Sequence, residues 1–165
     1  MGFKKKLSTS HALYVLQSTV DHYVNNGSTV NIALLDISKA FDNVNHDKLF
    51  KCLLDAGLPC HIVKLLSAWY FGSYARVRWG SCLSASFSLV TGVRQGGVLS
   101  PVLFSMYVND LILRLQTSGY GCSIGLQFIG CVMYADDLIL LSPSVTALQK
   151  MVDICVNEIA SLDLM

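Results

Sequence analysis

The stretch CVMYADDLILL, residues 131–141, decides the fold class of this chain. It joins two apolar runs, Ile124–Tyr134 and Leu138–Leu141, through only three residues, Ala135-Asp136-Asp137. Two apolar runs with so short a polar link predict a tight β-hairpin. A turn that only reversed the chain could use Asn-Gly, so two adjacent carboxylates, which repel each other, need a further explanation. A solvated turn is the plainer explanation, and a divalent-cation site is the functional alternative.

Helical and strand patterns surround that hairpin. A helix capped by Ser8-Thr9-Ser10 is predicted to end near Asn25-Asn26-Gly27, before a β-rich run over residues 29–36. Further helices are predicted over residues 45–57, 60–71, 100–115 and 145–162, and short strands over 74–78 and 84–91. This order predicts an α+β fold in which helices pack on one face of an antiparallel sheet.

The composition excludes two broad classes. The chain is 53% hydrophobic and 14% charged, with a mean hydropathy of +0.50, which excludes general disorder. The longest stretch without a formal charge, Leu115–Ala135, contains Gln116, Thr117 and several glycines, too polar a content for a membrane span. No apolar segment of a signal peptide follows Lys4–Lys6. We therefore expect an intracellular protein, in the nucleus or cytoplasm, without a membrane partner.

The near-neutral net charge of +1 hides an asymmetry. Residues 1–82 hold nine Lys/Arg and five Asp, a net of +4, and residues 83–165 hold three Lys/Arg and six acids, a net of −3. Chance can produce such small counts. The functional interpretation is a basic region that meets polyanions and an acidic region that holds cations.

Six cysteines are scattered along the chain without a CxxC pair, which argues against a zinc site. We expect them to be buried free thiols. They are Cys52, Cys60, Cys82, Cys122, Cys131 and Cys155.

Acidic residues are rare, so their positions are informative. Asp36 ends an apolar strand, and Asp136-Asp137 lies in the predicted hairpin turn. Carboxylates from two strands can together hold Mg²⁺ ions, which prefer oxygen ligands. Two such ions can activate an attacking hydroxyl and stabilise a leaving oxygen. The acids in or beside predicted helices are expected to be caps or solvated residues: Asp42, Asp47, Asp110 and Asp153.

Three segments together resemble the motifs of one family. Leu34–Asp42 (LLDISKAFD) resembles motif A of reverse transcriptases, Gly92–Pro101 (GVRQGGVLSP) the motif B region, and Tyr134–Asp137 the YADD box of motif C. Their sequences are similar to those of the non-LTR, LINE-type retrotransposon branch, and more distantly to those of group II intron maturases. Three motifs in the family's order are far more specific than a lone Asp-Asp pair.

The resemblance implies roles for individual residues. Asp36, Asp136 and Asp137 match the family's catalytic, metal-binding aspartates, which hold two Mg²⁺ or Mn²⁺ ions. Phe41 matches the aromatic residue that excludes a 2′-hydroxyl on the incoming nucleotide, the alternative being a core Phe. The other positions implied to border the nucleotide are Ile37, Ser38, Gln95 and Gly96.

Two basic residues are candidates for phosphate contacts. Arg94 carries the only positive charge between Arg78 and Arg114, and its alternative is a solvent-exposed turn arginine. Lys4 follows Gly2-Phe3, which resembles the end of a fingers motif that often reads Gly-Phe-Arg. Lysine keeps the charge there but lacks the bidentate fork of arginine, and a solvated terminus is the alternative.

The resemblance implies a right-hand polymerase palm, with residues 1–28 as the end of the fingers, residues 29–165 as the palm, and no thumb. The implied activity is that of an RNA-directed DNA polymerase, whose partners are an RNA template, a DNA primer and a deoxynucleoside triphosphate (dNTP). The oligomeric state is not predicted. The alternative is a truncated, non-catalytic remnant that acts at most as a nucleic-acid-binding fragment. A maturase-like splicing factor would need downstream RNA-binding segments.

Overall fold

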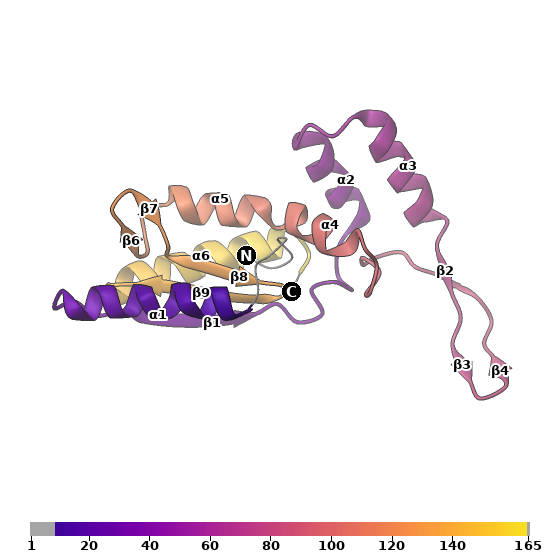
Figure 1. Cartoon of the computed structure of the whole chain (residues 1–165). Coiled ribbons are helices and arrows are strands. Elements are labelled where there is room, and N and C mark those ends of the chain that lie inside the picture. Colours follow the sequence, from indigo (N-terminus) through magenta and orange to yellow (C-terminus); the bar gives the residue numbers. More distant parts are fainter. Residues whose placement is uncertain (1–8, 165) are drawn as a thin grey trace. The chain divides into compact units, whose positions relative to one another are not determined.

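A computed structural model describes residues 9–164 of the chain (Figure 1). The described residues form two compact units. The first contains the residues up to Ala40 and those from Val108 onward, and the second is Phe41–Tyr107. The functional boundary predicted between residues 28 and 29 stays a prediction.

The first unit is built on an antiparallel sheet with the strand order β1-β9-β8. Its strands are β1 (Asn31–Asp36), β8 (Cys131–Tyr134) and β9 (Asp137–Ser142). Tyr134 pairs with Asp137, so the hairpin loop consists of Ala135 and Asp136 alone. The tight hairpin predicted from residues 131–141 is therefore confirmed, although Asp137 begins β9 and does not lie in the turn as predicted.

One face of this sheet carries the core of the first unit. Two residues of β9, Leu138 and Leu140, are fully buried against α5 (Asn109–Thr117) and α6 (Val145–Ser161). Full burial of each leucine contributes about 2 kcal/mol. The other fully buried members of this cluster come from the two helices, at helical spacing: Leu111, Leu115, Met151 and Cys155.

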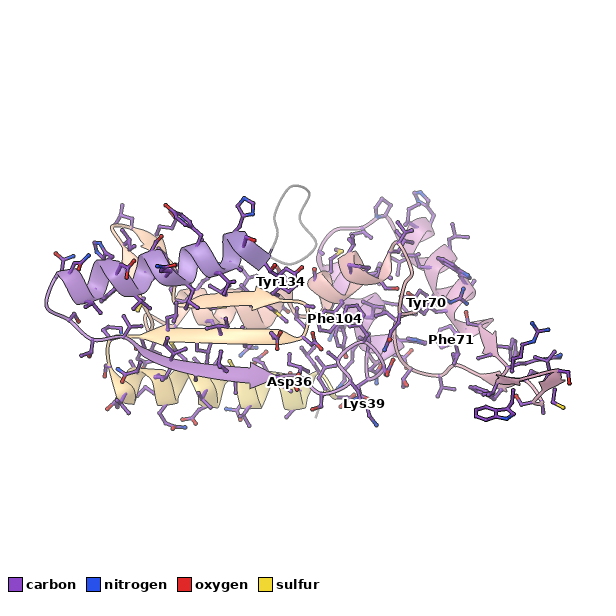
Figure 2. All side chains as sticks on the ribbon, turned by 60° about the horizontal axis from the view of Figure 1, so that its bottom comes forward. Asp36, Lys39, Tyr70, Phe71, Phe104 and Tyr134 are labelled. Atoms are coloured by element: carbon purple, nitrogen blue, oxygen red, sulfur yellow. The ribbon has the colours of Figure 1, made fainter. Side chains whose placement is uncertain are left out.

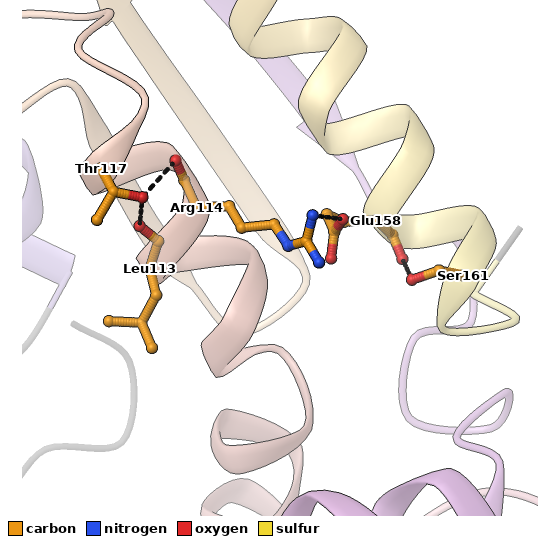
Figure 3. A network of polar contacts seen from close by, with 5 residues as sticks. All are labelled: Leu113, Arg114, Thr117, Glu158 and Ser161. Atoms are coloured by element: carbon orange, nitrogen blue, oxygen red, sulfur yellow. Dashed lines mark hydrogen bonds and ion pairs between the residues drawn. The ribbon is translucent and has the colours of Figure 1, made fainter.

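A surface ion pair also joins α5 and α6. Arg114 Nη1 lies 3.2 Å from Glu158 Oε1, and the Glu158 carbonyl accepts a hydrogen bond from Ser161 Oγ (Figure 3). Because the arginine side chain is 66% exposed, solvent screens the pair. The apolar cluster, and not this ion pair, therefore holds the two helices on the sheet.

The opposite face of β1 is open. Its outward residues alternate with the core-facing ones, and Ile32 and Leu34 are 46% and 75% exposed. The same alternation places Asp36 on this open face. Elsewhere in the unit, α1 (Thr9–Asn25) contacts β8, and the Tyr23 hydroxyl both donates to and accepts from the Ser123 backbone at 2.9 Å.

The second unit packs three helices together. They are α2 (His46–Asp55), α3 (Cys60–Phe71) and α4 (Ser100–Tyr107), and α2 contacts both of the others. Asn45 caps α2 as predicted, with its side-chain oxygen 3.2 Å from the Lys48 amide. Short strand pairs link α3 to the later segments: β2 (Tyr74–Ala75) pairs with β5 (Phe87–Ser88), and β3 (Arg78–Trp79) pairs with β4 (Cys82–Leu83).

Three predictions need correction. The helix predicted over residues 100–115 is two helices, because Val108 has ψ 5° and ends the regular backbone between α4 and α5. The run Ile124–Tyr134 is not one strand, since Gly125 at φ 60° turns the chain between β6 (Ser123–Ile124) and β7 (Gln127–Phe128). Two of the expected buried thiols, Cys60 and Cys82, are exposed.

Among residues 9–164, the helices are all too short or too polar to cross a membrane.

Candidate active site

The β1–β9 pairing places two carboxylates side by side. Asp36 and Asp137 are direct partners across the two strands. The Ile37 amide donates to the Asp136 carbonyl at 3.2 Å, which makes Asp36–Asp137 a non-hydrogen-bonded pair. In such pairs the Cα atoms lie about 4.5 Å apart and the side chains are closest. Two like charges so placed destabilise the sheet, and both residues are exposed.

The third carboxylate occupies the hairpin turn itself. Asp136 is half-buried and directly precedes Asp137. The two-residue turn forces Ala135 into the left-handed region at φ 54°, a conformation that costs an L-residue about 1 kcal/mol. The chain therefore accepts both backbone strain and charge repulsion at one end of the sheet.

The donor set at this end suits a hard cation. No group of three or more His, Cys, Asp or Glu side chains within residues 9–164 is arranged to hold a metal ion by itself. Mg²⁺ does not need such a cage, because it is commonly bound through one or two carboxylates together with water and substrate phosphates. The Asp36–Asp137 pair offers such carboxylates on an open face, so the residues fit Mg²⁺ or Mn²⁺.

A sharp turn follows β1. Ile37 is buried, and its carbonyl accepts a hydrogen bond from the Ala40 amide at 3.1 Å. Ser38 and Lys39 lie exposed in this turn, and Lys39 has a left-handed φ of 54°. Figure 2 shows Asp36 at the end of β1 with Lys39 beyond it. The sequence carries no signal for this strained lysine, because lysine does not favour that conformation.

In the second unit, the residues after the turn run beside the Gly92–Pro101 segment. The Val93 amide donates to the Phe41 carbonyl at 2.7 Å, and the Gly92 amide to the Val44 carbonyl at 2.8 Å. Gly92 is required, because it has φ +87° and an added Cβ would lie 2.8 Å from the Asp42 carbonyl oxygen. The Phe41 ring stacks on Phe104 with centroids 4.8 Å apart.

Gln95 is held by Asp42, which the sequence predicted to be only a cap or a solvated residue. Its amide nitrogen donates to the Asp42 carboxylate at 3.0 Å. Asp42 is exposed, as predicted, but it also orients Gln95. Farther along, the buried Ser100 hydroxyl donates to the Arg94 carbonyl and ties the glycine-rich loop to the start of α4.

A pocket of about 580 Å³ lies beside this loop. His46, 3% exposed, lines it; its Nε2 donates to the Gly92 carbonyl at 2.8 Å, and its Nδ1 has no hydrogen-bond partner among the described residues. Burial raises the pKa of Tyr70, another lining residue, although the Ser100 hydroxyl and the Arg94 charge oppose that rise. His46 therefore positions the loop. A single histidine in the sequence gives no signal of this role.

The predicted site residues fall into both units. The first unit brings together Asp36, Ile37, Ser38, Asp136 and Asp137. The second brings together Phe41, Arg94, Gln95 and Gly96. Arg94 is exposed and forms no ion pair with another described residue. Lys4 lies outside the described residues.

Comparison with known proteins identifies the family. The family model described as reverse transcriptase (RNA-dependent DNA polymerase) matches residues 1–165. The chain is 34% identical over 122 residues to the Pol polyprotein of the retrotransposable element R2DM of Drosophila melanogaster, covering 74% of this chain and 11% of that protein. It is 36% identical over 118 residues to the R2 polyprotein of Nasonia vitripennis, covering 72% and 11% respectively.

A solved structure shares the fold. A structure of apo telomerase from Candida tropicalis, truncated from its C-terminal domain, superposes with a TM-score of 0.68 and 16% identity, covering 96% of this chain and 33% of that one. This likeness confirms the α+β polymerase palm. The chain spans only about a tenth to a fifth of the length of the R2 relatives. The resemblance to non-LTR retrotransposon polymerases is confirmed, and the chain belongs to the reverse transcriptase (RNA-dependent DNA polymerase) family.

Proposed function

We propose that this chain carries the catalytic centre of an RNA-directed DNA polymerase of a non-LTR retrotransposon. A primer 3′-hydroxyl attacks the α-phosphate of a dNTP, the new P–O bond forms, and pyrophosphate leaves. The observation that carries the proposal is the strand register, which sets Asp36 opposite Asp137 and next to the Asp136 turn. The relatives are polymerases of retrotransposable elements, which supports the same reaction class.

The three aspartates provide the negative charge that such a reaction needs. Asp36 and Asp137 would hold divalent ions on the open face of the sheet, and Asp136 would complete the set from the turn. Two bound ions would lower the pKa of the attacking hydroxyl and neutralise the leaving pyrophosphate. The protein's own contribution is position: the hairpin fixes two carboxylates and β1 fixes the third, without covalent chemistry.

The nucleotide side of the site would use residues from the two segments that resemble motif A and the motif B region. Ile37 and Ser38 would offer backbone to the triphosphate in the turn after β1. Phe41 would lie under the sugar and exclude a 2′-hydroxyl, supported by its stack on Phe104. Gln95, oriented by Asp42, and Gly96 would border the base pair, while Arg94 would contact phosphate.

Primer extension tests the proposal. The full open reading frame that contains residues 1–165 is expressed, and dNTP incorporation is measured on a primed RNA template with Mg²⁺. Asp36→Asn, Asp136→Asn and Asp137→Asn are each expected to reduce the rate by at least about 100-fold, because each removes charge at the reacting phosphate.

Asp153→Asn is the matched control. Asp153 is an exposed residue of α6 that accepts a hydrogen bond from Gln149 at 2.9 Å, so its substitution should leave the rate unchanged. If the wild-type protein does not extend the primer, the non-catalytic remnant is the correct alternative. If extension survives Asp136→Asn, the catalytic assignment is wrong.

A further inference from the structure

A narrow, largely exposed arm emerges from the second unit. The arm is defined here as residues 74–88, which contain β2, β3, β4 and β5. Every side chain from Arg76 to Ser88 is exposed, and Trp79 at the tip is 86% exposed. Figure 1 shows the arm running away from the end of α3 as a two-stranded ribbon. A ribbon exposed on both faces buries no core of its own and is only marginally stable in water.

Local contacts nevertheless shape the arm. Gly80 at φ 60° and Ser81 form a two-residue turn between Trp79 and Cys82, which are strand partners. Below the turn, the Ser84 hydroxyl accepts from the Val77 amide at 2.9 Å, and the Ser84 amide donates to the Val77 carbonyl at 2.9 Å. The arm therefore presents a defined surface, although nothing among the described residues covers it.

The charge of the arm is entirely positive. Arg76 and Arg78 lie on it, and the chain has no acidic residue between Asp55 and Asp110. Neither arginine forms an ion pair with any residue in the described part of the chain. Two uncompensated guanidinium groups on an exposed ribbon are complementary to a polyanion and not to an apolar protein surface.

Aromatic side chains flank those arginines along the chain. Tyr74 is 64% exposed, and a hollow of about 400 Å³ on the arm is lined by Tyr74, Ala75, Arg76 and Ser86. Trp79 follows Arg78 at the tip. Exposed rings on which bases can stack, next to cations that meet phosphates, are the features with which proteins bind single-stranded nucleic acid.

We propose that the arm binds a single-stranded stretch of RNA, with Arg76 and Arg78 on phosphates and Tyr74 and Trp79 stacked on bases. The inference rests on the proposed function only in the choice of RNA, which the family description names. Unstacked bases are required, because an aromatic ring cannot reach a base inside a duplex.

Metal-free binding tests the arm independently of catalysis. The 165-residue chain is titrated into a fluorescein-labelled single-stranded RNA in EDTA, and the anisotropy is measured at several salt concentrations. Arg76→Gln with Arg78→Gln should weaken binding at low salt. It should also reduce the slope of log Kd against log salt by about 1.4, because each phosphate contact on a single strand contributes about 0.7.

Lys51→Gln with Lys64→Gln is the matched control. Both lysines are exposed on helices of the same unit, and their substitution removes the same charge from a different surface. This variant should leave the slope within the error of the wild type. Equal losses in the two double variants would show that binding follows net charge and would overturn the proposal.

Trp79 supplies a second readout that charge alone would not move. Trp69 and Trp79 are the two tryptophans, so in a Trp69→Phe background the fluorescence reports on Trp79. Single-stranded RNA should quench this emission, and Trp79→Ala should weaken binding by about 10-fold, whereas Trp79→Phe should retain most of it.

Other ligands or a protein contact would contradict RNA binding by the arm. Equal or tighter binding to duplex RNA, or to single-stranded DNA, would contradict the assigned ligand. Self-association of the chain that Trp79→Ala abolishes would assign the arm to a protein contact. Asp136→Asn should bind RNA normally in EDTA, so a failed arm and a failed catalytic centre give different results.

Discussion

At the scale of single residues, the end of the β1–β9 pair combines unfavourable features that the proposed cation would offset. Asp36 faces Asp137 in a non-hydrogen-bonded pair, and Ala135 holds a left-handed backbone one residue from Asp136. Sites that must bind charge commonly carry such costs, because the functional arrangement differs from the most stable one. The two facing carboxylates should therefore lower the free energy of unfolding when no cation is bound.

Asp137→Asn tests that cost directly. In EDTA the substitution should raise the free energy of unfolding by about 0.5 kcal/mol, because it removes the repulsion with Asp36 directly opposite. Urea denaturation measures the change, and Asp153→Asn on α6 should show none. A loss of stability in Asp137→Asn would mean that this carboxylate makes a favourable contact within the protein.

Phe41 should control the choice of sugar. Phe41→Ala removes the ring that is proposed to meet a 2′-hydroxyl, so incorporation of ribonucleotides relative to deoxynucleotides should rise by about 10-fold or more. The ratio of the two kcat/KM values on one template measures this. Because one preparation supplies both values, any loss of the Phe104 stack cancels in the ratio. An unchanged ratio would leave Phe41 as a core residue.

At the scale of elements, the sequence predicts best where the period of the pattern and the turn chemistry agree. The α2 cap at Asn45, the β1 run and the 131–141 hairpin were all predictable, because a capping Asn, a β-rich run and a short polar link act locally. The break at Val108 was not, since α4 and α5 form one apolar periodicity and separate only through the packing of each within its own unit.

The candidate site divides in the same way. The three aspartates could be predicted, because acids are rare and these lie at strand ends or in the turn that joins two strands. The hydrogen bonds from Gln95 to Asp42 and from His46 to Gly92 could not, since the partners are 53 and 46 positions apart and only the folded chain brings them together.

The hairpin turn offers an element-scale test. Ala135→Gly should raise the free energy of unfolding by up to about 1 kcal/mol, because glycine adopts φ 54° without steric cost. Ala33→Gly, in the extended backbone of β1 opposite Leu140, is the control and should lower it by about 0.5–1 kcal/mol. Thermal unfolding of both variants compares them. Equal destabilisation would show that the turn is not strained.

At the scale of the whole molecule, the many apolar residues fall into a buried group and an exposed group. One part builds the buried cluster under the sheet, and another part stays exposed, as Leu34 on the open face does. The exposed residues make the 165-residue chain prone to self-association.

The cysteines give a pH-dependent test of the core. Burial raises the pKa of Cys131 to about 11, and burial together with the neighbouring Cys131 raises that of Cys155 to about 12, from the ordinary 9.0. Above pH 9 the unfolded chain ionises these thiols while the folded chain does not. The free energy of unfolding should therefore be constant below pH 9 and should fall as the pH rises toward 12.

Alkylation checks the same assignment. In the native chain at about pH 8.5, iodoacetamide should label the exposed Cys60 and Cys82 and spare Cys131 and Cys155, because only the thiolate reacts. Peptide mass spectrometry identifies the labelled residues. Labelling of Cys155 as fast as Cys60 would show that the buried cluster between the sheet and the helices is accessible to the reagent.

The proposed cation site is tested by titrating Mn²⁺ into the 165-residue chain with a dNTP present and measuring the free ion by electron paramagnetic resonance. The wild type and Asp153→Asn should bind Mn²⁺ alike. Asp36→Asn with Asp137→Asn should weaken binding by at least about 10-fold, because it removes both carboxylates of the pair. Unchanged binding in that double variant would contradict the claim that the end of the β1–β9 pair is the cation site of the polymerase.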